Sequence, residues 1–225
     1  MTLAASLRAA ALAAVALSLA ACSNNAEGQV SALGTVQGLL KRAPVPKVPN
    51  PEQVAAMSAQ TLAGTSGPVI LFALPDRKQI TTLVRIETNR GYETYGSSDR
   101  RTVTLKGGMI TATRGLGEDI MSVDISGVAP LIRAAREGAA YRTNRHLDGE
   151  NITVAERSYC QIKIGSQSQI PLGAGSAQVT EVLESCVTDD LAYQNAYYIT
   201  QGGRIVQSRQ WHSPLNGYVI IQQLR

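Results

Sequence analysis

Acidic side chains come nearest to a catalytic arrangement in this chain. Glu118 with Asp119 and Asp189 with Asp190 are neighbouring carboxylates, and glycoside cleavage needs two carboxyl groups that flank one bond. Because adjacent residues of a strand point to opposite faces, each pair is better interpreted as a solvated edge. The sequence has no G-x-S-x-G elbow, phosphate loop, H-E-x-x-H motif or dinucleotide fingerprint. We therefore predict no catalytic residue, no metal site, no cofactor and no enzymatic activity.

Two arginines occupy matching positions in a repeated stretch. KGGMITATR (residues 106–114) and QGGRIVQSR (residues 201–209) align on a Gly-Gly pair, an Ile, a hydroxyl residue and an Arg. The planar guanidinium of Arg114 or Arg209 could bind an acidic sugar or a partner's carboxylate. Alternatively, each could bind loop carbonyls or pair internally, for instance with Asp119. We favour this second interpretation.

Trp211 and His212 are the other candidates for contact with a glycan or a partner. An indole can stack on a sugar face, and a histidine can change its charge near neutral pH. A lone Trp in a chain with one Phe is more often a core residue, however, and we favour that interpretation. A run of arginines follows the middle of the chain and is interpreted as a solvated face, with a contact for an anionic polymer or lipid A as the alternative: Arg133, Arg136, Arg142 and Arg145.

The N-terminus predicts an exported, lipid-anchored protein. Residues 1–21 hold one Arg and an apolar run that is too short to span a bilayer comfortably, which is typical of a signal peptide. They end in Leu-Ala-Ala before Cys22, which resembles the bacterial lipobox, whose Cys is acylated, for instance with palmitate. Ser23 in the next position favours the outer membrane. Residues 22–50 are small, polar and rich in proline, so we predict a flexible tether.

Cys160 and Cys186 are the cysteines that remain after Cys22. In an oxidising periplasm such a pair is most simply a disulfide. Zinc is the alternative, but it would need further soft ligands, and the chain offers only His146 and His212. We predict the disulfide.

Composition bounds the possible partners. The chain carries 21 basic and 17 acidic residues, a mild excess that is far from the clustered charge of a nucleic-acid-binding protein. One Trp and one Phe exclude a broad aromatic platform for sugars. A weakly basic surface could instead suit an anionic polysaccharide or lipid headgroups.

Periodicity predicts a mainly β fold. Residues 51–64 form a Pro-started helix, and alternating strands begin at Pro68. Gly107 and Gly108 predict a type I′ hairpin turn, residues 129–138 predict a second helix, and residues 165–177 predict a mobile loop. We interpret the body as two duplicated units of a helix and a β-meander, 51–126 and 129–225, packed as a sandwich or, preferably, a barrel. The predicted strands of the second unit are 152–155, 159–164, 179–187, 197–200, 204–211 and 218–224.

The sequence resembles the YjbF/GfcB family of bacterial lipoproteins. The resemblance rests on the lipobox at Cys22, on the segment TLKGGMITATRGLGED (residues 104–119) and on Trp211 near the end. It implies a barrel-like fold and an accessory role in making, secreting or anchoring an exopolysaccharide or a group 4 capsule. The expected partners are the membrane, the polysaccharide export machinery and an anionic polysaccharide.

These observations lead to three hypotheses for function. We favour a non-enzymatic outer-membrane lipoprotein, facing the periplasm, that assists polysaccharide export or assembly. A periplasmic enzyme that modifies polysaccharide is the main alternative, and a general envelope scaffold is the third. Acid and base groups converging in a groove would favour the enzyme.

Overall fold

The computed structural model describes residues 51–225, except residues 148, 173 and 174. The predicted signal peptide, Cys22 and the tether lie outside the described residues. In this part of the chain no helix combines the length and the apolar character needed to cross a membrane.

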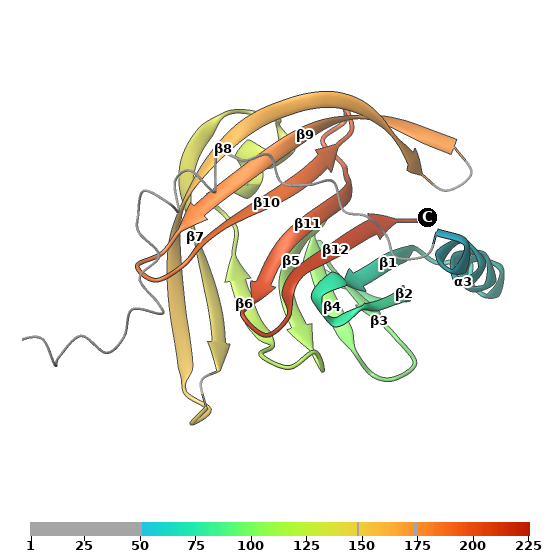
Figure 1. The fold of residues 1–225 in the computed structure, drawn as a ribbon, viewed down its shortest axis with the longest axis horizontal. Helices are drawn as coiled ribbons and strands as arrows, with labels where there is room; N and C mark the ends of the chain where they lie inside the picture. Colours follow the sequence, from blue (N-terminus) through green and yellow to red (C-terminus); the bar gives the residue numbers. More distant parts are fainter. Residues whose placement is uncertain (1–50, 148, 173–174) are drawn as a thin grey trace, which may run out of the picture. The chain divides into compact units, whose positions relative to one another are not determined.

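Twelve strands and two α-helices make up the described chain (Figure 1). The predicted helix over residues 51–64 is present. In chain order the elements are α3 (Pro51–Gly64), β1 (Val69–Leu74), the 3₁₀ turn η1 (Pro75–Arg77), β2 (Gln79–Asn89), β3 (Tyr92–Gly96), β4 (Thr102–Lys106), β5 (Met109–Arg114), β6 (Ile120–Asp124), α4 (Ala129–Arg133), β7 (Gly138–Leu147), β8 (Thr153–Leu172), β9 (Gly175–Val187), β10 (Ala192–Ile199), β11 (Ile205–Ser213) and β12 (Gly217–Gln223).

All twelve strands belong to one antiparallel sheet, which curls into a nearly closed barrel (Figure 1). Its order is β5-β4-β3-β2-β1-β12-β11-β10-β9-β8-β7-β6, so the first strand pairs with the last. The predicted mainly β, barrel-like fold is confirmed. β1–β6 fall within residues 51–126 and β7–β12 within 129–225, but the two sets share one sheet. Their origin by duplication stays a hypothesis.

The main core lies inside the curled sheet. Every residue of β1 is buried, and alternate members of that strand, Ile70, Phe72 and Leu74, belong to the same apolar cluster as Tyr197 and Val219. α3 packs on β2 and β1, where the Thr61 and Thr82 hydroxyl oxygens lie 2.6 Å apart. Burial on both sides explains why β1 reads as a continuous apolar run.

The predicted mobile loop at residues 165–177 is wrong. β8 continues to Leu172 and pairs with β9 through the described part of that region, including Ile170 with Ala177. A register shift between Ile164 and Gln167 bends the pair. Apolar side chains of the bent part then pack against a second small cluster on β9, β10 and β11. The Gly, Ser and Gln residues hid this strand, since they break its apolar alternation.

The second predicted helix is shorter than expected. α4 ends at Arg133 rather than near Gly138. Ala135 adopts a left-handed conformation with φ of 45°, and its N–H donates to the Ile132 carbonyl while the Arg136 N–H donates to the Leu131 carbonyl. This pair of bonds is a Schellman ending. The helix was predicted to end at Gly138, but the left-handed Ala135 terminates it earlier. Gly138 is instead the first residue of β7.

The predicted disulfide between Cys160 and Cys186 is confirmed. The two residues face each other on the paired strands β8 and β9, and both are buried. Glu184 lies beside the two sulfur atoms. Because both sulfurs are bonded to each other, this cluster offers one carboxylate and is no metal site.

Candidate functional site

The two Gly-Gly turns differ in their backbone conformation. Gly107 and Gly108 have φ of 59° and 87°, which confirms the predicted type I′ turn. In the second turn only Gly203 has positive φ, 77°, and the loop is closed by hydrogen bonds within Thr200–Arg204. The two turns are therefore not structurally equivalent, because the longer second loop needs a left-handed residue only at Gly203.

The two turns nevertheless meet in space. A Cβ atom on Gly108 would lie 2.7 Å from the Cβ of Ile205, and one on Gly203 would lie 2.8 Å from the Arg133 carbonyl oxygen. The Arg133 side chain covers the first turn, since a Cβ on Gly107 would lie 3.4 Å from its Cδ. Glycine is required at these close approaches, and Arg133 stands between the two turns.

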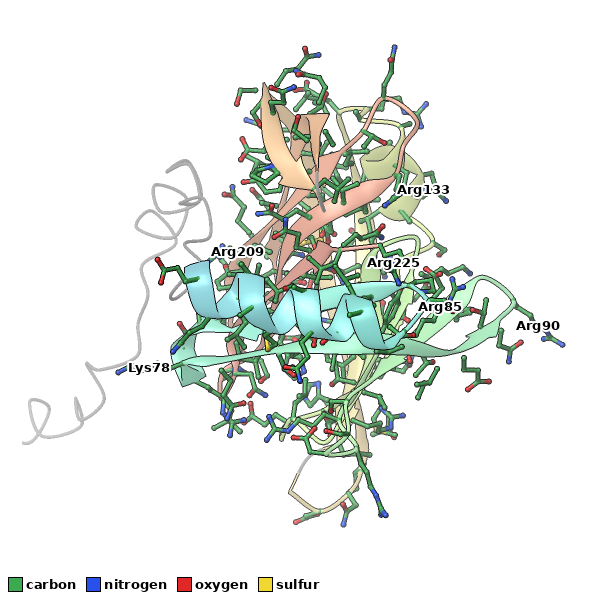
Figure 2. The ribbon with its side chains drawn as sticks, turned by 90° about the vertical axis from the view of Figure 1, so that its right-hand side faces the viewer. Lys78, Arg85, Arg90, Arg133, Arg209 and Arg225 are labelled. Atoms are coloured by element: carbon green, nitrogen blue, oxygen red, sulfur yellow. A yellow bond between two sulfur atoms is a disulfide. The ribbon has the colours of Figure 1, made fainter. Side chains whose placement is uncertain are left out.

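A hollow of about 380 Å³, here called the Gly-Gly hollow, lies between these turns. Among the described residues that line it, Glu93 is the one acidic residue, and its carboxylate lies 2.6 Å from Arg85. Figure 2 shows Arg133, Arg225 and Arg85 following one another along this side of the molecule. The cationic residues that line the hollow are Arg85, Arg133, Arg204 and Arg225.

A second hollow, the α4 hollow, measures about 620 Å³ and shares Arg133 as a wall. It also contains Lys106, Arg145 and Asp124. The Lys106 ammonium lies 4.4 Å from the ring centre of Tyr92, an aromatic residue that lines the same hollow. The two hollows together therefore present an extended surface with a strong excess of positive charge.

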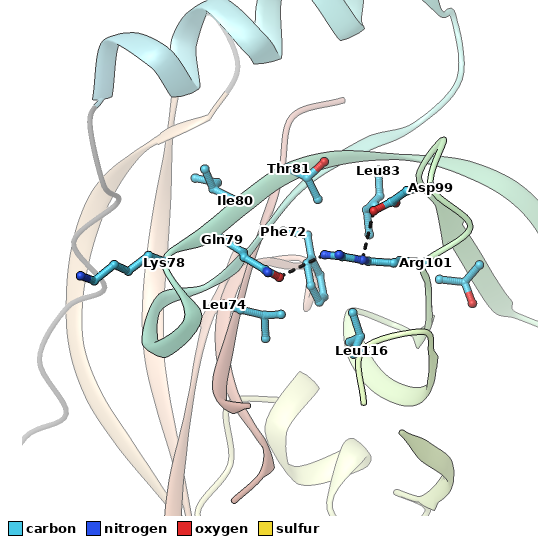
Figure 3. A pocket seen from close by; sticks show the side chains of 11 residues that line it. Phe72, Leu74, Lys78, Gln79, Ile80, Thr81, Leu83, Asp99, Arg101 and Leu116 are labelled. Carbon is cyan, nitrogen blue, oxygen red and sulfur yellow. Dashed lines mark hydrogen bonds and ion pairs between the residues drawn. The ribbon is translucent and has the colours of Figure 1, made fainter. Parts of the chain in front are cut away.

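A third hollow of about 420 Å³ opens beside β1 and β2 (Figure 3). Phe72 and Leu74 contribute apolar walls, whereas Lys78, Arg101 and Asp99 contribute charge. The Arg101 guanidinium donates to Gln79 at 3.0 Å and lies 3.1 Å from the Asp99 carboxylate. Since one of its two cations already has an acidic partner in the lining, this hollow has a smaller excess of positive charge than the other two.

The segment TRGLGED, on which the family resemblance rests, fastens the barrel at the junction of β5 and β6. The Asp119 carboxylate accepts the Thr113 hydroxyl at 3.0 Å and the backbone N–H groups of Gly115 and Leu116 at 2.7 and 3.1 Å. The Arg77 side chain donates to the Leu116 carbonyl at 2.7 Å. This loop is therefore held by side chains from distant parts of the chain, and its role is structural.

A side chain of β11 satisfies the backbone at the edge strand β5. The Ile110 N–H donates to the Gln210 side-chain oxygen at 2.9 Å, and the Gln210 amide donates to the Gly108 carbonyl at 3.1 Å. Gln210 is 1% exposed. Side chains thus replace a missing strand neighbour at this edge.

Arg114 and Arg209 are both engaged with the protein itself. Arg114 donates to the Ile120 carbonyl at 2.9 Å and so links β5 to β6. Arg209 donates to the Gln194 carbonyl at 3.3 Å, and its guanidinium lies 3.1 Å from the ring centre of Tyr218. The two arginines are not brought together into one site, and Asp119 is occupied by other partners. A binding role for either stays a prediction.

Trp211 and His212 lie in different environments. Trp211 is partly buried and makes an edge-on contact with Tyr218, with ring centres 5.2 Å apart. His212 is 4% exposed. Burial lowers the pKa of His212 from its ordinary 6.5 to about 4, while the charges of Asp119 and Glu118 act in the opposite direction. His212 is therefore neutral at pH 7, which removes the expected switch near neutral pH.

A buried ionic cluster inside the barrel was missed by the sequence analysis. Arg142, expected on a solvated face, is 4% exposed and lies 2.9 Å from the Glu184 carboxylate. The Tyr197 hydroxyl and the Asn195 amide donate to the same carboxylate oxygen at 2.8 and 2.7 Å. Burial opposes the charge of Arg142, but Glu184 holds the pKa of Arg142 above its usual range. The one sequence signal for the burial of Arg142 is its alternation along the strand with neighbours that are exposed.

Comparison with known families places the chain among the capsule polysaccharide lipoproteins. The model of the group 4 capsule polysaccharide lipoprotein family, gfcB/YjbF, matches residues 19–224. The chain belongs to this family.

Solved structures give a consistent fold. The hypothetical lipoprotein YmcC from Escherichia coli K12 is 16% identical and has a TM-score of 0.65, over 88% of this chain and 97% of that one. A putative exported protein with a YmcC-like fold from Bacteroides fragilis is 9% identical, with a TM-score of 0.30 over 70% and 93% of the two chains. The first similarity shows a shared fold, and the second is too weak to argue from. No curated protein matches the chain.

Proposed function

We propose that this chain is an outer-membrane lipoprotein that assists the secretion or assembly of a capsule-type polysaccharide without catalysing a reaction. Membership of the capsule polysaccharide lipoprotein family supports the pathway. The lipobox at Cys22 and the following Ser23 support acylation and the outer membrane. A periplasm-facing body on a tether would meet the polymer or its export machinery during transit.

One observation supports the non-enzymatic role: the buried acid and base groups are engaged in structural contacts. Glu184 binds Arg142, Asn195 and Tyr197. Among the residues that the structure describes, Thr113 with His212 most resembles a hydroxyl beside a base, with 3.0 Å between Oγ1 and Nε2. That hydroxyl is buried, however, and it already donates to a carboxylate. A hydroxyl in such contacts stabilises the fold and is not placed to attack a substrate.

Gene deletion with complementation tests this function. Loss of the gene should lower surface polysaccharide while the polymer's composition stays unchanged, and the intact gene should restore it. The purified protein should leave the isolated polymer unchanged in length and substitution by mass spectrometry. Cleavage or a change of substituents would favour the polysaccharide-modifying enzyme, and unchanged surface polysaccharide in the deletion strain would favour a general scaffold.

Cys22→Ala tests the anchor. The change should leave a soluble or unprocessed precursor, because the described residues contain no helix able to span a membrane. Detergent partitioning and the mass of the mature N-terminus measure this outcome. A mature wild-type chain that starts at another residue, or that carries no acyl group, would refute the anchor without touching the polysaccharide role.

A further inference from the structure

The surface formed by the Gly-Gly hollow and the α4 hollow is unusually basic for this protein. Glu93 and Asp124 are its acidic lining residues. Against these two stand six cations, and that excess equals the formal net charge of the entire chain, +4. The cations are Arg85, Lys106, Arg133, Arg145, Arg204 and Arg225. Positive charge is thus concentrated on one surface instead of being spread over the molecule.

Arg133 is the centre of this surface and its least constrained cation. It lines both hollows, and its side chain rests on the bare backbone at Gly107. Among the described residues neither Arg133 nor Arg145 has an ion pair or a side-chain hydrogen bond, but Arg133 is exposed and Arg145 is half-buried; Arg85 pairs with Glu93, and Arg204 binds Gln223. An exposed guanidinium with five donors and no partner in the fold is suited to an oxygen anion.

The shape of the surface favours a chain over a single small anion. Hollows of about 380 and 620 Å³ on the two sides of Arg133 each lie in the range of sites for small molecules, about 300–1,000 Å³. Their cations line concave walls instead of projecting from a convex face, which suits a polymer strand better than a flat layer of headgroups. Tyr92, with 39% of its surface exposed, adds a ring on which a sugar could stack.

We propose that the Gly-Gly hollow and the α4 hollow form one binding groove for a strand of acidic polysaccharide, with Arg133 bound to a sugar carboxylate at its centre. This inference rests on the proposed function and assigns a substrate class and a site to it.

Binding of oligogalacturonate to the full chain, purified in detergent, tests the groove. An octamer should bind at low salt more tightly than a trimer, because only the longer strand reaches both hollows, and neutral maltooctaose should not bind. Arg133→Gln should weaken octamer binding about tenfold, as expected for loss of a hydrogen bond to a charged group. Lys106→Gln should weaken octamer binding but leave trimer binding at the Gly-Gly hollow unchanged.

Arg90→Gln is the matched control. Arg90 is exposed and lines neither hollow, and Figure 2 shows it at the far end of the β2–β3 hairpin. Octamer binding should change less than twofold in this variant. Because the side chains of Arg133, Lys106 and Arg90 are all exposed, the three variants should melt like the wild type.

Two results would overturn the groove. One is octamer binding that Arg133→Gln and Lys106→Gln leave unchanged. The other is binding to phosphatidylglycerol vesicles, lost in Arg133→Gln, with no binding of oligogalacturonate, which would make the surface a lipid contact. Either result would leave the proposed function intact if gene deletion still lowers surface polysaccharide. Conversely, groove binding without any deletion phenotype would refute the proposed function alone.

Discussion

His212→Gln should flatten the dependence of stability on pH. The Thr113 hydroxyl donates to Asp119, so its oxygen accepts a hydrogen bond from the Nε2–H group of His212, 3.0 Å away. Nδ1 then lacks a proton and accepts from the Asn216 amide at 3.3 Å and from the Ser213 hydroxyl at 3.1 Å. We therefore assign the neutral Nε2–H tautomer, on the basis of these contacts. A second proton would displace both donors at Nδ1.

The size of the effect follows from the pKa of His212, which burial lowers from 6.5 to about 4. Between these values the unfolded chain binds a proton and the folded chain does not, so the free energy of unfolding falls as pH falls. At 1.36 kcal/mol per pKa unit the total is about 3 kcal/mol, of which about 2 kcal/mol is lost between pH 7 and pH 5. Below pH 4 no further loss arises from this group.

Urea unfolding at pH 7 and pH 5, followed by the fluorescence of Trp211, measures this loss. Trp211 is the chain's only Trp and lies next to the substituted residue. His212→Gln should lower stability at pH 7 and lose about 2 kcal/mol less than the wild type between the two pH values. Gln210→Met, a change at an equally buried position that does not titrate, should keep the wild-type difference. An unchanged difference in His212→Gln would refute the assignment of the neutral ring.

Three further sets of substitutions test the interior, the turns and the disulfide. Arg142→Ala should lower the free energy of unfolding by about 3–5 kcal/mol, since it leaves Glu184 charged and buried. Adding Glu184→Gln should restore part of this loss, and the absence of any recovery in urea unfolding would contradict the electrostatic explanation. Gly107→Val should cost about 1–3 kcal/mol because φ is 59° there, whereas Gly202→Val should cost less than about 0.5 kcal/mol because a Cβ meets no atom within 4 Å; equal losses of melting temperature would refute the difference between the turns. Cys160→Ser should cost roughly 3–4 kcal/mol, the chain-entropy value for a separation of 26 residues, and a reductant should then lower the melting temperature of the wild type alone.

Local patterns predicted the parts of this fold that depend on local chemistry. The Gly107 turn needs positive φ at two successive positions, and the Gly-Gly pair in the sequence indicates such a turn. The helix over 51–64 is marked by a proline at its start and a glycine at its end. The disulfide followed from a count of two cysteines and from the compartment that the N-terminus indicates.

The remaining features depend on contacts between distant residues. Arg142 reads as a surface residue, because its partner Glu184 is reached only through the pairing of β7 with β8 and of β8 with β9. Gln210 gives no sign that it completes the edge of β5. The proposed basic groove was predicted only in part. Contact of Arg133 and Arg145 with an anionic polymer was the less favoured alternative, because the repeat drew attention to Arg114 and Arg209, and only the structure places Arg133 between the two turns.

The pairing of β1 with β12 has a consequence for the order of folding. Phe72 lies opposite Ile221, so the barrel cannot close until nearly the whole chain is available. Closure of so large a loop is slow, because its loop-closure entropy must be lost before the contact between the two strands forms. Until then VILFAL, residues 69–74, is an uncharged, strongly apolar strand with one side unpaired. Such a segment is prone to aggregate. We therefore expect the nascent protein to need a holding chaperone until its last strand is made.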